Sequence, residues 1–254
     1  MNDVGKRKFD KEQQVQDWLE SVIEQNMLSD VIIGADKVRK SLAGYESPEF
    51  QPQFPIDYLT RLGNLRAAQH VLGELHTLEL VSKNDRSISR EKGERLFVDL
   101  LYCARETSRF VLFEIKNQDG SAREAVTEIM AYEHEALNHT PFSSTNDVMM
   151  VIVSRSFSTL LDHAVTGLNS WSRRRVLCLR FEDGDADPRL VVHIPSAWSA
   201  IGQKGLTTNG IVTATLSFRP SPDLGEDDIH AVCSTAARLM VREAERSGGS
   251  GFAM

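Results

Sequence analysis

The chain has 254 residues, a mass of 28.4 kDa and a formal net charge of −7 at pH 7. Its 41% hydrophobic and 26% charged residues are typical of a folded globular protein, which excludes the disordered and fibrous classes. The acidic balance argues against a protein that coats nucleic acid non-specifically, because phosphate binding needs clustered lysine and arginine.

Neither an export signal nor a membrane span is expected. Residues 1–10 lead into a polar run, and no apolar run approaches the roughly 20 residues needed to cross a bilayer. The cysteines are odd in number and lie in apolar sequence, which favours reduced core thiols over a disulfide framework or a zinc site. They are Cys103, Cys178 and Cys233. We therefore expect a cytoplasmic protein that does not bind membranes.

The first part of the chain predicts two helices and a linker. Apolar residues at helical spacing predict an amphipathic helix over residues 10–25 that packs on the main domain. The glycines and prolines of residues 43–55 are typical of a linker. A second helix is expected over residues 57–76, where Gly63 and Gly73 interrupt the helical pattern.

A hairpin is expected in the middle of the chain. Residues 77–81 form a β-compatible run, followed by a polar loop over residues 82–93. Residues 96–103 and 110–116 are rich in apolar and aromatic side chains, which predicts two strands. The short polar connection at residues 104–109 is typical of a hairpin turn.

A helix is predicted over residues 122–138, where Ser121 and Glu124 form a capping box at its start. We expect this helix to pack on the preceding sheet. The side that faces the sheet is predicted to carry Val126, Ile129, Met130, Glu133 and Leu137.

The rest of the chain alternates strands and helices. Strands are predicted at residues 147–154, 176–181, 189–194 and 210–218. Helices are predicted at residues 157–171 and 227–246, with a turn at residues 184–188. The order of elements predicts an α/β protein, with a mixed β-sheet flanked by helices.

Charged residues interrupt two strands that are otherwise apolar. Asp99 lies in the first strand of the hairpin, and Glu114 and Lys116 share one face of the second. Buried charges are costly unless they are paired or bind metal. Two carboxylates brought together by the hairpin would repel each other unless a cation lay between them. The sequence therefore predicts a Mg²⁺ or Mn²⁺ site with Asp99 and Glu114 as ligands.

The same residues predict hydrolytic chemistry. A divalent ion held by Asp99 and Glu114 could lower the pKa of a bound water and orient it for attack on a phosphate. Lys116 would stabilise the developing negative charge, or would help to deprotonate the nucleophile if burial lowered its pKa.

Asp99 on one strand of a hairpin, followed by Glu114 and Lys116 on the next strand and then by a helix, resembles the PD-(D/E)xK nuclease superfamily. The resemblance covers residues 70–154 at most. It implies a restriction-endonuclease-like αβββαβ core, in which the two acids hold the metal and the lysine assists catalysis. Val98 replaces the Pro of the family name, at a position that binds no metal.

The resemblance also implies auxiliary residues. The family often has a Glu on the helix before the first strand, and the candidates here are Glu74 and, as a second choice, Glu79. On the helix after the lysine, Glu128 matches a position that is often Gln or Glu, and Tyr132 follows one turn later. The competing interpretation makes Glu128 a solvent-facing acid and Tyr132 a half-buried aromatic.

A basic run, Arg173, Arg174 and Arg175, follows the helix of residues 157–171. It either contacts phosphates or favours the helix C-terminus, as cations do. The seven histidines lack zinc-ligand spacing and partner cysteines, and we interpret them as structural or surface residues. No serine has the Gly-x-Ser-x-Gly context of a serine hydrolase.

The composition and periodicity divide the chain into an N-terminal helical extension and linker (1–55), a domain with C-terminal strands and a helix (56–246), and a flexible tail (247–254). The resemblance implies that the domain at residues 56–246 is a PD-(D/E)xK nuclease-like domain and the protein a metal-dependent nuclease. DNA is the expected substrate, in phage defence or DNA repair, with RNA as an alternative. The rival hypotheses are a catalytically inactive module of this fold that binds nucleic acid or regulates, and an assembly subunit with an acidic docking face. The sequence leaves the oligomeric state open, with a homodimer or a larger complex as alternatives.

Overall fold

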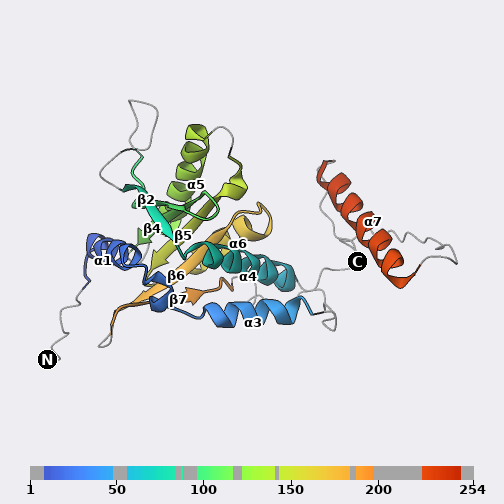
Figure 1. Cartoon of the computed structure of the whole chain (residues 1–254), viewed down its shortest axis with the longest axis horizontal. Coiled ribbons are helices and arrows are strands. Elements are labelled where there is room, and N and C mark those ends of the chain that lie inside the picture. The colour runs from blue at the N-terminus through green and yellow to red at the C-terminus, as the bar shows by residue number, and fades with distance from the viewer. Residues whose placement is uncertain are drawn as a thin grey trace. The chain divides into compact units, whose positions relative to one another are not determined.

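The computed structural model describes residues 9–47, 56–83, 87, 96–116, 122–140, 143–183, 187–196 and 225–246. The chain divides into two compact units, Met1–Leu206 and Thr207–Met254. The described part of the second unit consists of Gly225 and helix α7 (Glu226–Arg246). All other labelled elements belong to the first unit (Figure 1).

A seven-stranded sheet with the strand order β1-β7-β6-β5-β4-β3-β2 forms the centre of the first unit (Figure 1). Its strands are β1 (Ile32–Ile33), β2 (Leu78–Lys83), β3 (Leu100–Ala104), β4 (Arg109–Lys116), β5 (Val148–Ser154), β6 (Val176–Glu182) and β7 (Arg189–His193). The pairs β4–β5, β5–β6 and β1–β7 are parallel, and the other pairs are antiparallel. The predicted α/β class with a mixed sheet is therefore confirmed.

Helices flank this sheet and bury two apolar cores against it. The first core receives residues from α1 (Glu12–Glu24), α2 (Leu28–Val31), α3 (Ala35–Tyr45) and α4 (Ile56–Glu74). The second core receives residues from α5 (Ala122–His139) and α6 (Thr159–Ser170). Strand β4 serves both cores, because alternate side chains point to opposite faces: Phe113 lies in the first core and Leu112 in the second.

The central strand β5 shows why the sheet needs helices on both sides. It lies between β4 and β6, and each of its seven residues is buried. A strand covered on both faces has no solvent-facing positions, so its sequence is a continuous apolar run instead of an alternating one. A short 3-10 helix (Thr145–Asp147) leads into it.

Helix α1 packs on the sheet, as its apolar stripe predicts. Val15, Leu19 and Ile23 recur every four residues and are buried. Just before the helix, the Phe9 ring packs edge-on against Phe181 of β6, with ring centroids 5.3 Å apart. The segment predicted as an N-terminal extension thus lies in the same compact unit as the sheet.

Several predicted boundaries were wrong. Helix α3 ends at Tyr45, so the predicted linker 43–55 begins inside a helix. Strand β3 begins at Leu100 and not at residue 96. The pattern also missed β1, a two-residue strand that exists only through its pairing with β7.

Two predictions about burial were also wrong. Met130 is 51% exposed, because it lies about 100° around α5 from the buried Ile129. Of the predicted core thiols, only Cys178 is buried, whereas Cys103 is half-buried and Cys233 is exposed. All three cysteines are free, which confirms that they form no disulfide framework.

Some predictions lie outside the described residues. These are the capping interaction of Ser121 with Glu124, most of the 82–93 loop and of the 184–188 turn, the strand at residues 210–218 and the tail at residues 247–254. The described helices include none that is long and apolar enough to cross a bilayer.

Candidate functional site

The acidic residues meet where β3 begins and β4 ends. The antiparallel ladder closes with Leu100 of β3 opposite Phe113 of β4. One residue before β3, the Asp99 carboxylate accepts a hydrogen bond from the backbone N–H of Ile115, at 2.7 Å. This side-chain hydrogen bond joins Asp99 to β4 beyond the last residue pair of the ladder. The hairpin therefore brings Asp99 next to the strand that carries Glu114.

Lys116 bridges two glutamates at this end of the sheet. Its Nζ atom lies 2.6 Å from Oε1 of Glu114 and 2.7 Å from Oε2 of Glu128. Glu114 is only 2% exposed, whereas the Glu128 side chain, which comes from α5, is 38% exposed. Oε2 of Glu114 is buried and receives no hydrogen bond from the described residues. The site thus combines Asp99, two glutamates and one lysine.

The negative charges of the carboxylates at this site repel one another. Burial, the charge of Asp99 and the contact with Glu128 raise the pKa of Glu114 to about 9. Burial raises the pKa of Asp99 to about 6, although the Ile115 N–H and Lys116 act to lower it. Without a further cation, the two groups therefore resist being charged together. A divalent ion between them would remove this resistance.

Lys116 is a stable ammonium in this environment. Burial acts to lower its pKa, but the hydrogen bonds and charges of Glu114 and Glu128 outweigh burial and raise the pKa above its ordinary value. The condition for a role as a base, a pKa lowered by burial, is therefore not met in the metal-free protein. Lys116 therefore contributes a positive charge to the site.

The structure brings both α5 candidates to the site. Glu128 contacts Lys116, and its pKa is lowered because the interactions with Glu114 and Lys116 outweigh the effect of burial. Tyr132, one turn later, is 6% exposed. Burial and then the charges of the nearby carboxylates, among them Asp99, raise the pKa of Tyr132. Both residues therefore lie on the side of α5 that faces the acidic site.

The structure does not bring Glu74 or Glu79 to the site. Glu74 pairs with Arg109 at the first residue of β4, and Glu79 pairs with Arg105 in the β3–β4 turn. At about 3.3 Å per residue, the start of β4 lies about 20 Å from Lys116 at its end. The helix acid expected from the resemblance is thus neither of these residues.

The basic run also lies at the far end of the sheet. Arg174 pairs with the buried Glu133 at 3.1 Å, and Arg175 contacts His70 at 2.6 Å. Arg173 occupies the left-handed region with a φ of 52°. The run immediately precedes β6, which is aligned in the same direction as β4 through β5, so it lies near the start of β4. These arginines do not converge on the acidic site.

Sequence reasoning missed two α1 residues beside Asp99. Gln16 is 4% exposed, and its Nε2 donates to the backbone carbonyl of Asp99 at 3.0 Å. The charge of Glu12, one turn earlier, acts to raise the pKa of Asp99. A polar Gln16 directly beside the buried stripe was the available signal. Its partner lies 83 residues away in the chain, so the contact could not be predicted.

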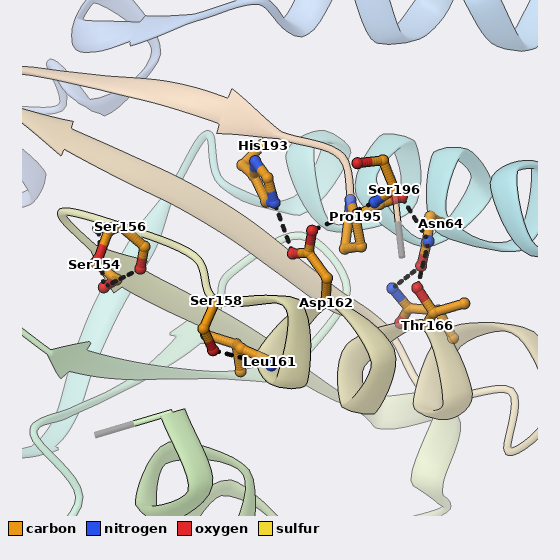
Figure 2. Close-up of polar contacts among 11 residues, drawn as sticks. Asn64, Ser154, Ser156, Ser158, Leu161, Asp162, Thr166, His193, Pro195 and Ser196 are labelled. Atoms are coloured by element: carbon orange, nitrogen blue, oxygen red, sulfur yellow. Dashed lines mark hydrogen bonds and ion pairs between the residues drawn. The ribbon is translucent and has the colours of Figure 1, made fainter. Parts of the chain in front are cut away.

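A second polar cluster joins α6 to the end of β7 (Figure 2). Nε2 of His193 lies 2.7 Å from Oδ1 of Asp162, and the imidazole stacks on Phe157 with centroids 4.4 Å apart. Ser196 approaches the other carboxylate oxygen with its backbone N–H, at 3.4 Å. The pair of His193 and Asp162 fastens a strand to a helix, which agrees with a structural role.

The serines near this pair are engaged with the backbone. The Ser154 hydroxyl donates to the carbonyl of Ser156, and the Ser158 hydroxyl accepts from the N–H of Leu161 (Figure 2). Among the residues drawn there, none places a hydroxyl on His193 by a hydrogen bond. The figure thus gives no support to a serine nucleophile.

No protein-family model, curated protein or solved structure matches this chain. The described side chains include no group of three or more His, Cys, Asp or Glu residues arranged to hold a metal ion. Mg²⁺ needs fewer protein ligands, because it commonly takes one or two carboxylates and completes its shell with water and phosphate. Asp99 and Glu114 fit that donor set.

Proposed function

We propose that this protein is a Mg²⁺- or Mn²⁺-dependent nuclease that hydrolyses phosphodiester bonds, with DNA as the substrate, in phage defence or DNA repair. The observation that carries the proposal is the pair formed by the half-buried Asp99 and the buried Glu114, which resist charging together and lie near the ammonium of Lys116. Strongly perturbed carboxylates of this kind gather at functional sites more often than elsewhere.

The order of elements around the site gives independent support. Helix α4, strands β2, β3 and β4, helix α5 and strand β5 follow one another in the chain. This is the α-β-β-β-α-β order that the resemblance to PD-(D/E)xK nucleases implies. Asp99 lies at the start of the second of these strands, and Glu114 and Lys116 lie at the end of the third.

Asp99 and Glu114 could both be ligands of a cation. Oδ2 of Asp99 accepts from the Ile115 N–H, and Oε1 of Glu114 faces Lys116. Oε2 of Glu114 is buried and has no hydrogen-bond partner among the described residues, which a bound cation would provide. A bound divalent ion would supply an activated water and neutralise charge on the phosphate.

The remaining residues then have separate roles. Lys116 keeps its proton and would stabilise the negative charge that develops on the phosphate. Glu128 contacts the ammonium from the α5 side at 2.7 Å, and this contact would keep Lys116 in place if Glu114 were a metal ligand. Tyr132, one turn after Glu128, is buried in the second apolar core next to the site.

A cleavage assay tests the proposal. Purified protein is incubated with plasmid, linear and single-stranded DNA and with RNA, each with Mg²⁺, Mn²⁺ or EDTA. The Asp99→Asn variant keeps an acceptor for the Ile115 N–H and should fold, yet lose cleavage. The control is Glu79→Gln, which removes an exposed carboxylate at the far end of the hairpin and should cleave normally.

The same assay separates the proposal from its rivals. The ion pairs of Lys116 with Glu114 and Glu128 also suit an inactive module of this fold, in which the lysine permanently takes the place of a metal. Such a module would bind DNA but would not cleave it in the presence of either Mg²⁺ or Mn²⁺. Equal cleavage by the wild type and by Asp99→Asn would contradict the assigned site, and cleavage of RNA alone would replace the proposed substrate.

A further inference from the structure

Gln16 is a buried polar residue on a helix whose other buried residues are apolar. It is 4% exposed and lies beside Val15 in the stripe that packs on the sheet. A buried amide is unfavourable unless its hydrogen bonds are made. Gln16 makes one of them with the carbonyl of Asp99, 3.0 Å from Nε2. The helix thus directs a donor at the backbone of a proposed metal ligand.

With this contact, both the side chain and the backbone of Asp99 accept a hydrogen bond. The Asp99 carboxylate is held by the N–H of Ile115, and its carbonyl is held by Gln16. Asp99 precedes the first residue of β3, so the β3–β4 ladder itself ends beside it. A residue at the end of a ladder needs further contacts to keep one orientation, and α1 supplies one.

The start of α1 is itself fastened near the ends of β5 and β6. Arg155, which follows β5, donates to the carbonyl of Phe9 at 2.6 Å. The same guanidinium donates to Asp183, which follows β6, at 2.7 Å. Because β4 and β5 are parallel and pair up to Lys116 with Ser154, these ends lie at the same edge of the sheet as the acidic site. Gln16 therefore projects from a helix with a set position.

We propose that Gln16 is a positioning residue of the metal site, which orients Asp99 through its backbone so that its carboxylate faces the cation. This inference rests on the proposed function. Residues that orient metal ligands typically contribute about 10- to 100-fold to metal affinity or activity. Helix α1 is then part of the site and not only a cover for the sheet.

The test uses Gln16→Met, which keeps the side-chain length and helix preference and removes the N–H donor. Gln16→Leu serves as a second variant in case the first folds poorly. The matched control is Gln13→Met, because Gln13 is on the exposed face of the same helix and donates only to the exposed Asp17. Mn²⁺ affinity is measured by titration calorimetry on the full chain, well below the melting temperature.

The proposal expects Mn²⁺ affinity to fall roughly 10- to 100-fold in both Gln16 variants and to stay unchanged in Gln13→Met. The kcat for DNA should fall as well, with KM for DNA unchanged. A merely structural Gln16 would lower the melting temperature and leave the Mn²⁺ affinity of the folded protein as it was, which would overturn the inference. If the wild type binds no Mn²⁺, the proposed function fails first, so the two failures are distinguishable.

Discussion

Lys116 and Glu114 form an ion pair with 2.6 Å between Nζ and Oε1, and their side chains are only 14% and 3% exposed. The pair exists whether or not the site is catalytic. Removing Lys116 would disturb the stability of the metal-free protein in both cases, because the buried Glu114 carboxyl would lose the cation beside it. Melting temperatures alone therefore cannot assign the site, whereas turnover and metal affinity can.

Lys116→Ala should separate metal binding from turnover. An ammonium does not bind Mg²⁺, so metal affinity should stay the same or rise slightly when the positive charge is removed. Turnover should fall by at least about a hundredfold, the scale of losing one preorganised charge. Calorimetric Mn²⁺ titration and cleavage rates on one preparation measure both. The control is Lys83→Ala, which breaks the ion pair with Glu20 elsewhere. Normal turnover in Lys116→Ala would show that the lysine is structural.

Glu114→Gln should change the pH dependence of stability. The Glu114 carboxyl has an ordinary pKa of 4.5 and a pKa of about 9 in the folded, metal-free protein, so the folded state binds this proton more tightly. The free energy of unfolding therefore falls as the pH rises through that interval. The variant has no such proton to lose.

The comparison for Glu114 is a set of melting curves in EDTA at pH 5, 7 and 9. Glu114→Gln should gain melting temperature relative to wild type as the pH rises, and should not cleave DNA at any of these values. Parallel curves for the two proteins would contradict the raised pKa.

Gly63→Ala and Gly73→Ala should have opposite effects although both glycines lie in α4. A Cβ atom at Gly63 would lie 2.6 Å from Oγ and 3.0 Å from Cα of Ser170, whereas a Cβ atom at Gly73 meets nothing within 4 Å. Overpacking should destabilise the first variant by about 2 kcal/mol. The better helix preference of alanine should stabilise the second by up to about 1 kcal/mol. Urea denaturation measures both, and equal shifts would refute the close approach of α4 and α6.

Arg155→Met should lower the free energy of unfolding by about 3 kcal/mol, because it removes the guanidinium that pairs with the Asp183 carboxylate, whose side chain is 9% exposed. The control is Arg105→Met, whose pair with Glu79 is more than half exposed. Loss of that pair should cost less than about 1 kcal/mol. Chemical denaturation of the two variants at neutral pH gives the difference. A small effect of Arg155→Met would mean that α1 does not depend on this anchor.

Local patterns in the sequence were sufficient for most of the elements and for the centre of the site. Period-two and period-3.6 spacing of apolar residues depends only on near neighbours, so β4, β5, α1 and α5 could be predicted close to their observed bounds. The same spacing placed Glu114 and Lys116 on one face of a strand. The interruption of an apolar run was enough to select Asp99.

Only the tertiary structure decided which distant residues join that centre. Gln16 and Glu12 reach Asp99 because α1 packs across the sheet, whereas Glu74 and the arginines before β6 face the opposite end. The protonation of Lys116 was likewise decided by Glu114 together with Glu128 from α5, because their combined interactions outweigh burial. Contacts between residues far apart in the chain depend on helix placement and strand direction, and these arise from the packing of the whole core and not from any local spacing.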